Sequence, residues 1–313
     1  ATTEIYTLSL HNALPISGSP KLSIMSFHGA FHGRMFGCLS TTHSKPVHKL
    51  VFPSFDWPIA PFPKLKYPLE AHAAENAAEE QRCLAEVDRL FNEWKDKCPV
   101  AGLVIEPIQA EGGDNHASAD FFQKLQALCK KHGAGFIVDE VQTGGGNAGR
   151  MWAHEAWNLP TPPDAVTFSK KMMTGGFFYA DHLRPTQSYR IFNTWLGDPT
   201  KIVQLEAVVD TIKQDNLLEG VRVTGAYILD NFRAFQKLYP TVLSNARGMG
   251  TLIAIDIKDA ATRDKMIFDL RQVGIEIGGC GSSAIRLRPS LVFQPKHAEI
   301  LLNKFEEVVK KYV

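Results

Sequence analysis

Two stretches of this chain place a reactive side chain directly after a predicted strand. In residues 135–146 (GFIVDEVQTGGG), an apolar run ends in two carboxylates, the first of them Asp139, and then breaks into three glycines. In residues 164–171 (DAVTFSKK), a similar run ends in two lysines, the first of them Lys170. Ligands of open α/β sheets bind in the crevice beyond the carboxyl ends of the strands. Asp139 and Lys170 are therefore expected there, although each taken alone also fits a helix cap or a solvated loop residue.

Length and composition place the chain among globular proteins. Its 313 residues suffice for two domains of ordinary size, and 44% of them are hydrophobic and 21% charged. A formal net charge of +1, without a Lys/Arg run, gives no indication of a nucleic-acid or membrane partner. No apolar run reaches the roughly 18 residues that span a bilayer. Five scattered cysteines without metal-ligand spacing favour a reducing compartment.

Strand and helix patterns alternate through the first part of the chain, which predicts an α/β fold with a mainly parallel sheet. Ser118 or Asp120 can cap a helix that Gly133 stops. A strand, a helix and a strand joined by short links form a right-handed parallel unit. Residues 52–68 hold five prolines and are expected to form an extended surface connection. The expected elements are strands at 22–27, 100–107 and 135–139 and helices at 69–97 and 121–131.

A strand and a long helix are expected next. Residues 188–196 (SYRIFNTWL) have strand character, and the end of that strand would expose Asn193 and Thr194. The helix after it would bear apolar residues on one face. These residues are Ile202, Leu205, Val209 and Ile212.

The pattern changes near residue 215, where a second, smaller α/β domain is expected to begin. Its strands are predicted at 251–257 and 285–287. Its final amphipathic helix bears Leu301, Phe305, Val308 and Tyr312. The division expected for the whole chain is a leader at 1–20, a large domain at 21–214 and a small domain at 215–313.

The first 20 residues fit poorly with the rest of the chain. They lack the basic segment and apolar core of a secretory signal, and they lack the Arg-rich pattern of a transit peptide. We interpret them as a non-native or disordered leader. Further on, His28 and His32 have the spacing of a metal pair on a helix, but Gly29 and Gly33 indicate a loop, so no metal site is expected.

Six motifs succeed one another along the chain after residue 20. They are SFHGAFHGR (26–34), IEPIQAEGGDNHAS (105–118), VDEVQTGGG (138–146), TFSKKMMTGGF (167–177), RIFNTWLGDP (190–199) and IRLRPSLVF (285–293). Together they resemble the pyridoxal-phosphate-dependent aminotransferases of the ornithine/4-aminobutyrate subgroup. The resemblance implies a fold-type I transferase with a large and a small domain, pyridoxal 5'-phosphate as cofactor, and a homodimer.

The resemblance assigns cofactor contacts to three residues at the end of the strand predicted at 135–139 and to one acid elsewhere. Asp139 matches the aspartate that keeps the pyridine nitrogen protonated, so that the ring can absorb electrons. Val141 would pack on the ring, and Gln142 would hydrogen-bond near its phenolate oxygen. Glu106 matches a further acid of the active site.

The amine side of the site falls on the second strand. Lys170 matches the Schiff-base lysine, because it directly follows Thr-Phe-Ser, and it needs a depressed pKa to act as a neutral amine. Lys171 is the competing candidate. Ser169 and Thr194 match positions that contact the phosphate, the threonine reaching the cofactor of the partner subunit.

The resemblance also implies two substrate arginines. Arg34 matches the residue that grips the distal carboxylate of 4-aminobutyrate, next to Phe31, and Arg286 matches the one that takes the α-carboxylate of glutamate or 2-oxoglutarate. Glu111 would pair with Arg286 when the shorter substrate is bound. The alternative for both arginines is a surface or interdomain salt bridge.

The implied activity moves the amino group of 4-aminobutyrate to 2-oxoglutarate, giving succinate semialdehyde and glutamate in two half-reactions. Two alternatives remain open: a related enzyme that uses ornithine or β-alanine, and a non-catalytic paralogue that only dimerises. The family is mitochondrial in animals, which predicts the mitochondrial matrix, with the cytoplasm as the alternative. Family members carry a further segment before the equivalent of Lys21, including a phosphate-gripping loop, so we interpret the chain as an N-terminally truncated member that binds its cofactor weakly.

Overall fold

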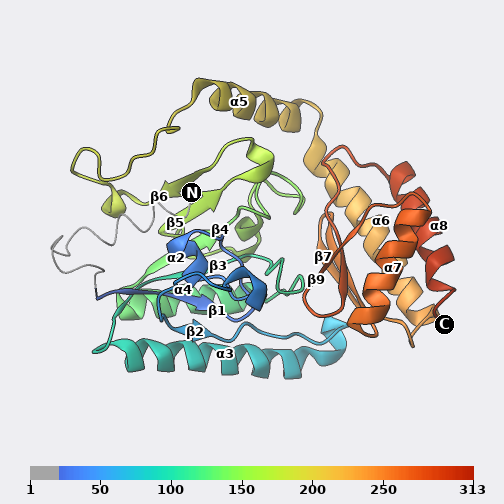
Figure 1. Ribbon diagram of the computed structural model, residues 1–313, viewed down its shortest axis with the longest axis horizontal. Coiled ribbons are helices and arrows are strands. Elements are labelled where there is room, and N and C mark those ends of the chain that lie inside the picture. Colours follow the sequence, from blue (N-terminus) through green and yellow to red (C-terminus); the bar gives the residue numbers. More distant parts are fainter. Residues whose placement is uncertain (1–20) are drawn as a thin grey trace.

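The computed structural model describes residues 21–313, which form two β-sheets (Figure 1). The predicted leader at 1–20 lies outside the described residues. The first sheet has the order β2-β1-β3-β4-β5-β6 and is parallel except for β6, which runs antiparallel to β5. Its strands are β1 (Ser23–Phe27), β2 (Ile59–Ala60), β3 (Val100–Ile105), β4 (Gly135–Asp139), β5 (Ala165–Phe168) and β6 (Gly176–Tyr179). The predicted α/β class and mainly parallel sheet are confirmed.

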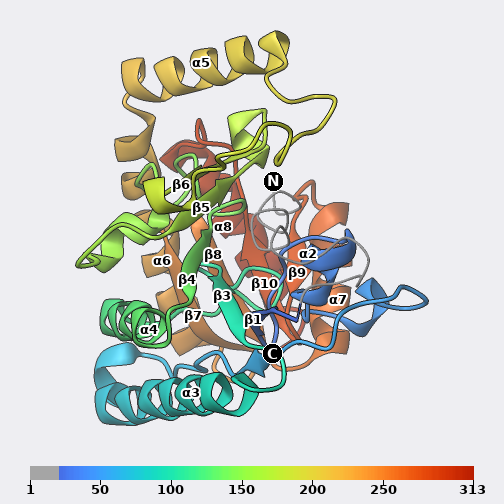
Figure 2. The same ribbon diagram turned by 90° about the vertical axis from the view of Figure 1, so that its left-hand side faces the viewer.

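Two long helices, α3 (Ala73–Trp94) and α4 (Ala119–His132), lie side by side against one face of this sheet, as both ribbon views show (Figures 1 and 2). Their apolar faces enter one core with the inward side chains of β1, β3 and β4. The predicted ends of α4 are confirmed. Ser118 Oγ accepts a hydrogen bond from Phe121 N at 3.1 Å, and Gly133 adopts the left-handed conformation that ends the helix. A short helix, α2 (Phe36–Ser40), comes after β1.

The second sheet is antiparallel, with the order β7-β8-β10-β9. Helices α6, α7 and α8 pack together with it around a second apolar core (Figure 1). The strands predicted at 251–257 and 285–287 and the final amphipathic helix are all present. The elements are α6 (Leu217–Leu238), β7 (Leu243–Met249), β8 (Leu252–Ile257), α7 (Ala260–Gln272), β9 (Gly278–Cys280), β10 (Ala284–Leu287) and α8 (Pro295–Val309).

The two sheets have separate cores, and α5 (Pro199–Gln214) and α6 connect them. This arrangement supports the proposed boundary near residue 214, which remains a proposal. Side chains also link the second sheet and its helices to the loop after β4 of the first sheet. Asn147 Nδ2 donates to the carbonyl of Pro289 at 2.8 Å, and Arg222 Nη1 donates to that of Gly149 at 2.6 Å.

The strand predicted over residues 188–196 is wrong. This segment forms turns, with Tyr189 at a φ of +62° and Trp195 N bonded to Asn193 Oδ1 at 2.9 Å. Strand character in sequence does not make a strand unless another strand satisfies its backbone, and no described strand pairs with this segment. The predicted helix after it exists as α5, but of the four apolar positions expected on one face only Ile212 is buried.

The connection at 52–68 is extended but is only partly a surface segment. Its first residues are exposed, whereas Trp57, Ala60 and Phe62 are buried, and β2 within it pairs with β1. The prolines therefore did not indicate how much apolar surface this segment covers.

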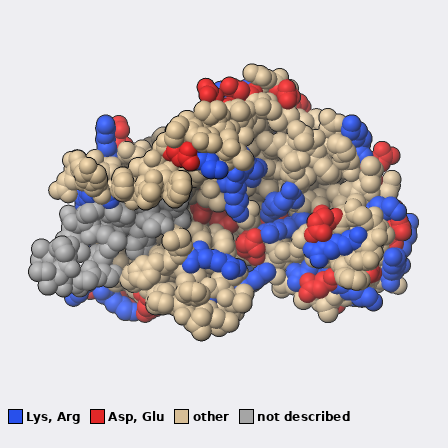
Figure 3. Space-filling model, turned by 45° about the horizontal axis from the view of Figure 1, so that its top comes forward, with Lys and Arg blue, Asp and Glu red and all other residues tan. Residues whose placement is uncertain are grey.

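Charged side chains of both signs are interspersed over the face that Figure 3 shows, and many gather near its middle. Among the described residues, no helix is long and apolar enough to cross a membrane. No cluster of His, Cys, Asp and Glu in that same part of the chain is suited to hold a metal ion. Cys83, Cys98, Cys129 and Cys280 are free thiols.

Candidate active site

Asp139 ends β4 with its carboxylate fixed by three hydrogen-bonding partners. The residue is only 4% exposed. Its Oδ1 accepts hydrogen bonds from Val141 N and from Thr167 Oγ1, each at 3.0 Å, and its Oδ2 lies 2.8 Å from His32 Nδ1. Thr167 is the residue of β5 that pairs with Asp139 in the sheet. The parallel register thus sets the position of the acid, and its partners set its orientation.

His32 is a site residue that the sequence did not reveal. The histidine spacing suggested a metal pair and the glycines a loop, but the loop places His32 against Asp139, which lies 107 residues further along the chain. Burial alone would lower the pKa of His32, but the hydrogen bond and charge of Asp139, with the charge of Glu106, hold it above its usual value. The carboxylate of Asp139 therefore stabilises the protonated form of His32.

Glu106 comes directly after β3, the neighbour of β4, and is also buried. Its Oε1 accepts from Phe31 N at 2.9 Å and its Oε2 from Ala110 N at 3.2 Å. Burial raises the pKa of Glu106 to about 7; His32 opposes this rise and Asp139 adds to it. The side chain ties the loop after β1 to the loop after β3, on the same edge of the sheet as Asp139.

Lys170 comes after β5 and begins a short 3-10 turn, Lys170–Met172. Its φ of +52° is in the left-handed region, which is uncommon for a residue with a side chain and marks local strain. The residue as a whole is exposed, but partial burial of its amine lowers the pKa. Glu111 and Asp139 oppose this fall and Arg286 adds to it, which places Lys170 within the field of the other site charges.

Lys171 is engaged elsewhere. Its Nζ donates to the backbone oxygen of Gln142 at 2.7 Å, which ties the turn after β5 to the loop after β4. Burial, with the neighbouring charge of Lys170, lowers the pKa of Lys171 to about 8. Of the two lysines, Lys170 has the more accessible amine.

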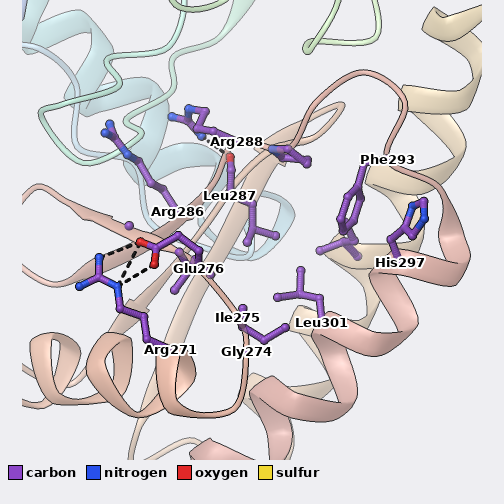
Figure 4. Close-up of a pocket in the computed structure, with 14 residues that line it drawn as sticks. Arg271, Gly274, Ile275, Glu276, Arg286, Leu287, Arg288, Phe293, His297 and Leu301 are labelled. Atoms are coloured by element: carbon purple, nitrogen blue, oxygen red, sulfur yellow. Dashed lines mark hydrogen bonds and ion pairs between the residues drawn. The ribbon is translucent and has the colours of Figure 1, made fainter.

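The ion pair predicted between Glu111 and Arg286 is present. Arg286 Nη1 lies 2.6 Å from Glu111 Oε1, joining β10 of the second sheet to the loop after β3 of the first. Their side chains are 21% and 19% exposed, so the pair stands between the two sheets but is open to solvent. Arg286 also borders a cavity of about 540 Å³ that Lys170 and Asp139 do not line (Figure 4).

The remaining predicted site residues differ in how close they lie to Asp139 and Lys170. Phe31 lies at the site, since its backbone bonds Glu106 and its ring meets that of His48 at 5.2 Å. Arg34 is exposed, and after burial its charge is the main cause that lowers the pKa of His48. No ion pair joins Arg34 to an acid within residues 21–313. Thr194 is exposed in the turns after residue 188, and Val141, Gln142 and Ser169 adjoin Asp139 and Lys170 in sequence.

The model of the family "Aminotransferase class-III" matches residues 11–309, and the chain belongs to that family. It is 53% identical over 310 residues to "4-aminobutyrate aminotransferase, mitochondrial" of Sus scrofa and 54% identical to "4-aminobutyrate aminotransferase" of Dictyostelium discoideum, covering 99% of this chain each time. The chain spans 61% and 62% of the length of these two relatives.

The fold is also similar to that of a solved lysine aminotransferase from M. tuberculosis in the internal aldimine form. The TM-score is 0.90 at 28% sequence identity, and the match covers 100% of this chain and 73% of that one. The predicted family and fold class are confirmed by these comparisons.

Proposed function

We propose that the protein is a pyridoxal-phosphate-dependent aminotransferase that moves the amino group of 4-aminobutyrate to 2-oxoglutarate. The single observation that carries this proposal is the Glu111–Arg286 ion pair, whose two charges both act on Lys170, an amine of lowered pKa. An arginine that pairs with a carboxylate of the protein, and can exchange it for one of the substrate, suits an enzyme that alternates between substrates with one and with two carboxylates. The relatives' names agree with this choice of substrate.

The described residues fit the cofactor. A buried carboxylate, Asp139, stands at the carboxyl edge of the sheet with a histidine behind it, which suits a protonated ring nitrogen. When bound, pyridoxal phosphate supplies an aldehyde that captures amines and a ring that absorbs an electron pair. Asp139 would hold the ring nitrogen. Val141 and Gln142 would lie along the ring, Ser169 and Thr194 at the phosphate, and Glu106 near the site's edge.

Lys170 would move the proton. Its Nζ, when neutral, can accept a proton from the amine-bearing carbon of the substrate and return it at a neighbouring position, which is general acid–base catalysis by one group. The lowered pKa raises the neutral fraction of this amine, and the strained backbone holds it at the edge of the sheet.

The two arginines would orient the substrates. Arg34 and Phe31 would receive the carboxylate of 4-aminobutyrate, while Glu111 keeps Arg286 neutralised. With 2-oxoglutarate or glutamate, the second carboxylate would replace Glu111 on the guanidinium, which binds a carboxylate through two parallel hydrogen bonds.

We test the catalytic assignment with Lys170→Ala, using Lys171→Ala as the matched control. The protein is incubated with pyridoxal phosphate, reduced with borohydride and mapped by peptide mass. We expect the label on Lys170, its absence in Lys170→Ala and its retention in Lys171→Ala. Glutamate formation from 4-aminobutyrate should fall by roughly a hundredfold to ten-thousandfold in Lys170→Ala, the range for a group that transfers protons. A label on Lys171, or full turnover in Lys170→Ala, would overturn the assignment.

The donor is tested separately by replacing 4-aminobutyrate with ornithine or β-alanine at equal concentration. The proposal requires that 4-aminobutyrate gives the highest kcat/KM. A higher value for ornithine would support the related enzyme instead, and turnover with none of the three would support a non-catalytic paralogue.

We also propose a homodimer. The segment before α5 and α5 itself expose large apolar side chains, which form the kind of surface that a second copy can bury. These side chains are Tyr189, Phe192, Trp195, Leu196 and Ile202. Sedimentation at several concentrations tests this: a chain that remains monomeric would contradict it. For the location we propose the mitochondrial matrix, because several relatives are named mitochondrial, with the cytoplasm as the alternative.

A further inference from the structure

The loop after β3 is joined to β10 and the residue after it by two ion pairs, not one. Arg286 reaches Glu111, and two residues further on Arg288 reaches Asp114. Alternate residues of an extended segment lie on the same face, and Figure 4 shows the two arginine side chains extending the same way. The loop over residues 109–115, which we name the gate loop, therefore meets this segment through two parallel contacts.

The acids of the two ion pairs differ in access to solvent, whereas the two arginine side chains are 21% and 22% exposed. The side chain of Glu111 is 19% exposed, whereas that of Asp114 is 1% exposed. Breaking a buried pair costs far more than breaking an open one, because it leaves an unpaired charge without water. A substrate carboxylate can thus compete for Arg286, while the Arg288–Asp114 pair stays closed.

A third arginine holds the backbone of the gate loop. Arg247 of β7 is 7% exposed; its Nε donates to the carbonyl of Asp114 at 3.0 Å and its Nη2 to that of Gly113 at 2.5 Å. Nη2 also bonds Asp256 at 2.8 Å, and Nη1 bonds the carbonyl of Asn245 at 2.7 Å. With its donors committed in this way, Arg247 is not poised to bind a ligand, so its effect is on the loop.

Further contacts fix the loop next to Glu111 itself. Gly281 N, in the turn between β9 and β10, donates to the carbonyl of Glu111 at 3.1 Å. A Cβ at Gly281 would lie 2.7 Å from Gly113 Cα, so the two turns are in close contact. Gln109 and Asn115 exchange backbone hydrogen bonds of 3.0 and 3.2 Å and close the base of the loop. The main chain of Glu111 is therefore held by its own carbonyl and by the closed base of the loop, whereas its side chain is partly exposed.

We propose that Arg247, together with the Arg288–Asp114 pair, is a positioning element for Glu111. It keeps the gate loop fixed, so that Glu111 leaves and re-covers Arg286 by side-chain rotation alone. The positioning element thereby sets how strongly the protein distinguishes ligands with one carboxylate from ligands with two. This inference rests on the proposed function, in which Arg286 receives the second carboxylate.

The physical consequence is a change in the ratio of two affinities. If the loop drifts, Glu111 no longer masks Arg286. A ligand with one carboxylate then leaves that guanidinium unpaired and binds more weakly, whereas a ligand with two carboxylates meets an open partner. Arg286 itself stays in place, because β10 is paired on both sides, with β8 and β9.

The test uses Arg247→Lys, which keeps the charge but loses the planar group that reaches two carbonyls. Arg222→Lys is the matched control, since Arg222 also donates from the second-sheet side to a carbonyl, that of Gly149, but does not contact the gate loop. Dissociation constants of two unreactive probes, glutarate and butyrate, are measured by calorimetry in the protein loaded with cofactor. We expect the preference for glutarate over butyrate to rise about tenfold in Arg247→Lys, within the range of coupling between contacting residues, and to stay unchanged in Arg222→Lys.

The decisive comparison is in a Glu111→Gln background. If Arg247 acts through Glu111, adding Arg247→Lys to Glu111→Gln changes the ratio no further. An equal change of both affinities in Arg247→Lys, or a full change that persists without Glu111, would overturn the inference. Should Arg247→Lys not fold, Asp256→Asn, which removes the charged partner of Arg247, must shift the ratio in the same direction.

The two levels of proposal can fail separately. A wild-type protein that neither transfers an amine nor prefers glutarate to butyrate would overturn the proposed function. A wild-type protein that does both, with a ratio insensitive to Arg247, would overturn only the positioning role.

Discussion

Asp139 and Lys170 stand at the ends of neighbouring strands, but their surroundings differ. Asp139 is buried and held by three hydrogen-bonding partners from three segments of the chain. Lys170 is exposed, has a strained φ and begins a turn of three residues. The end of β4, which we call the fixed end, therefore holds a charge in place, and the end of β5 presents an exposed amine.

The difference arises from the packing of each strand end. β4 lies between β3 and β5, so the residues after it meet the loops of both neighbours. The turn after β5 contacts the exposed helix α5 and leads to the edge strand β6. A proton-transferring group benefits from the looser position, whereas a group that stabilises charge works best when it is already oriented.

The strongest test of this comparison is Asp139→Asn, which removes the charge from the fixed end with little change in shape. We expect glutamate formation to fall by about a hundredfold to a thousandfold, as when one preoriented electrostatic group is lost. Asp164→Asn is the control, because Asp164 precedes β5 at its opposite end, where it accepts a hydrogen bond from Phe136 N at 2.7 Å. Equal losses in both variants would show that the acid acts through the sheet and not through the site.

A smaller effect is expected from His32→Gln, which keeps a hydrogen-bonding group but removes the imidazole behind Asp139. Outer partners that orient a site residue are commonly worth roughly tenfold to a hundredfold, as known for ligands of metals. The affinity for pyridoxal phosphate should fall along with turnover. His182→Gln is matched to it, since His182 also faces an aspartate, at 3.3 Å, but is 63% exposed. A loss in His182→Gln as large as in His32→Gln would break the comparison.

Local sequence signals predict the strands and the helix around both strand ends. The runs that became β3, β4 and β5 are continuous and apolar because these strands are largely buried in the sheet, and Ser118 and Gly133 mark the ends of α4. The motifs also single out Asp139, Glu106 and Lys170, which lie at the carboxyl ends of neighbouring strands, and the Glu111–Arg286 pair, which the structure contains.

Contacts between distant segments had no such signal. Arg247 lies 133 residues from the carbonyl of Asp114 that it bonds, and nothing near residue 247 indicates that contact. The wrong prediction over residues 188–196 has a different cause. The local pattern there favours a strand, but no described strand lies beside it to pair with. Sequence periodicity shows which structure a segment is able to form, but the segment forms a strand only where the tertiary structure offers a neighbour to pair with.

The finest test of the comparison concerns Glu106, which follows β3 beside the end of β4 and has a pKa raised from 4.5 to about 7. Between these two values the folded protein binds this proton and the unfolded chain does not. The free energy of unfolding should therefore decline as the pH rises through this window, and the raised pKa of His32 acts in the same direction. In Glu106→Gln the decline, measured by urea unfolding at several pH values, should become shallower. Glu299→Gln, an exposed acid of α8, should keep the wild-type slope. If Glu106→Gln also kept that slope, the acid would titrate as it does in water, and the surroundings of Glu106 would be less closed than its hydrogen bonds indicate.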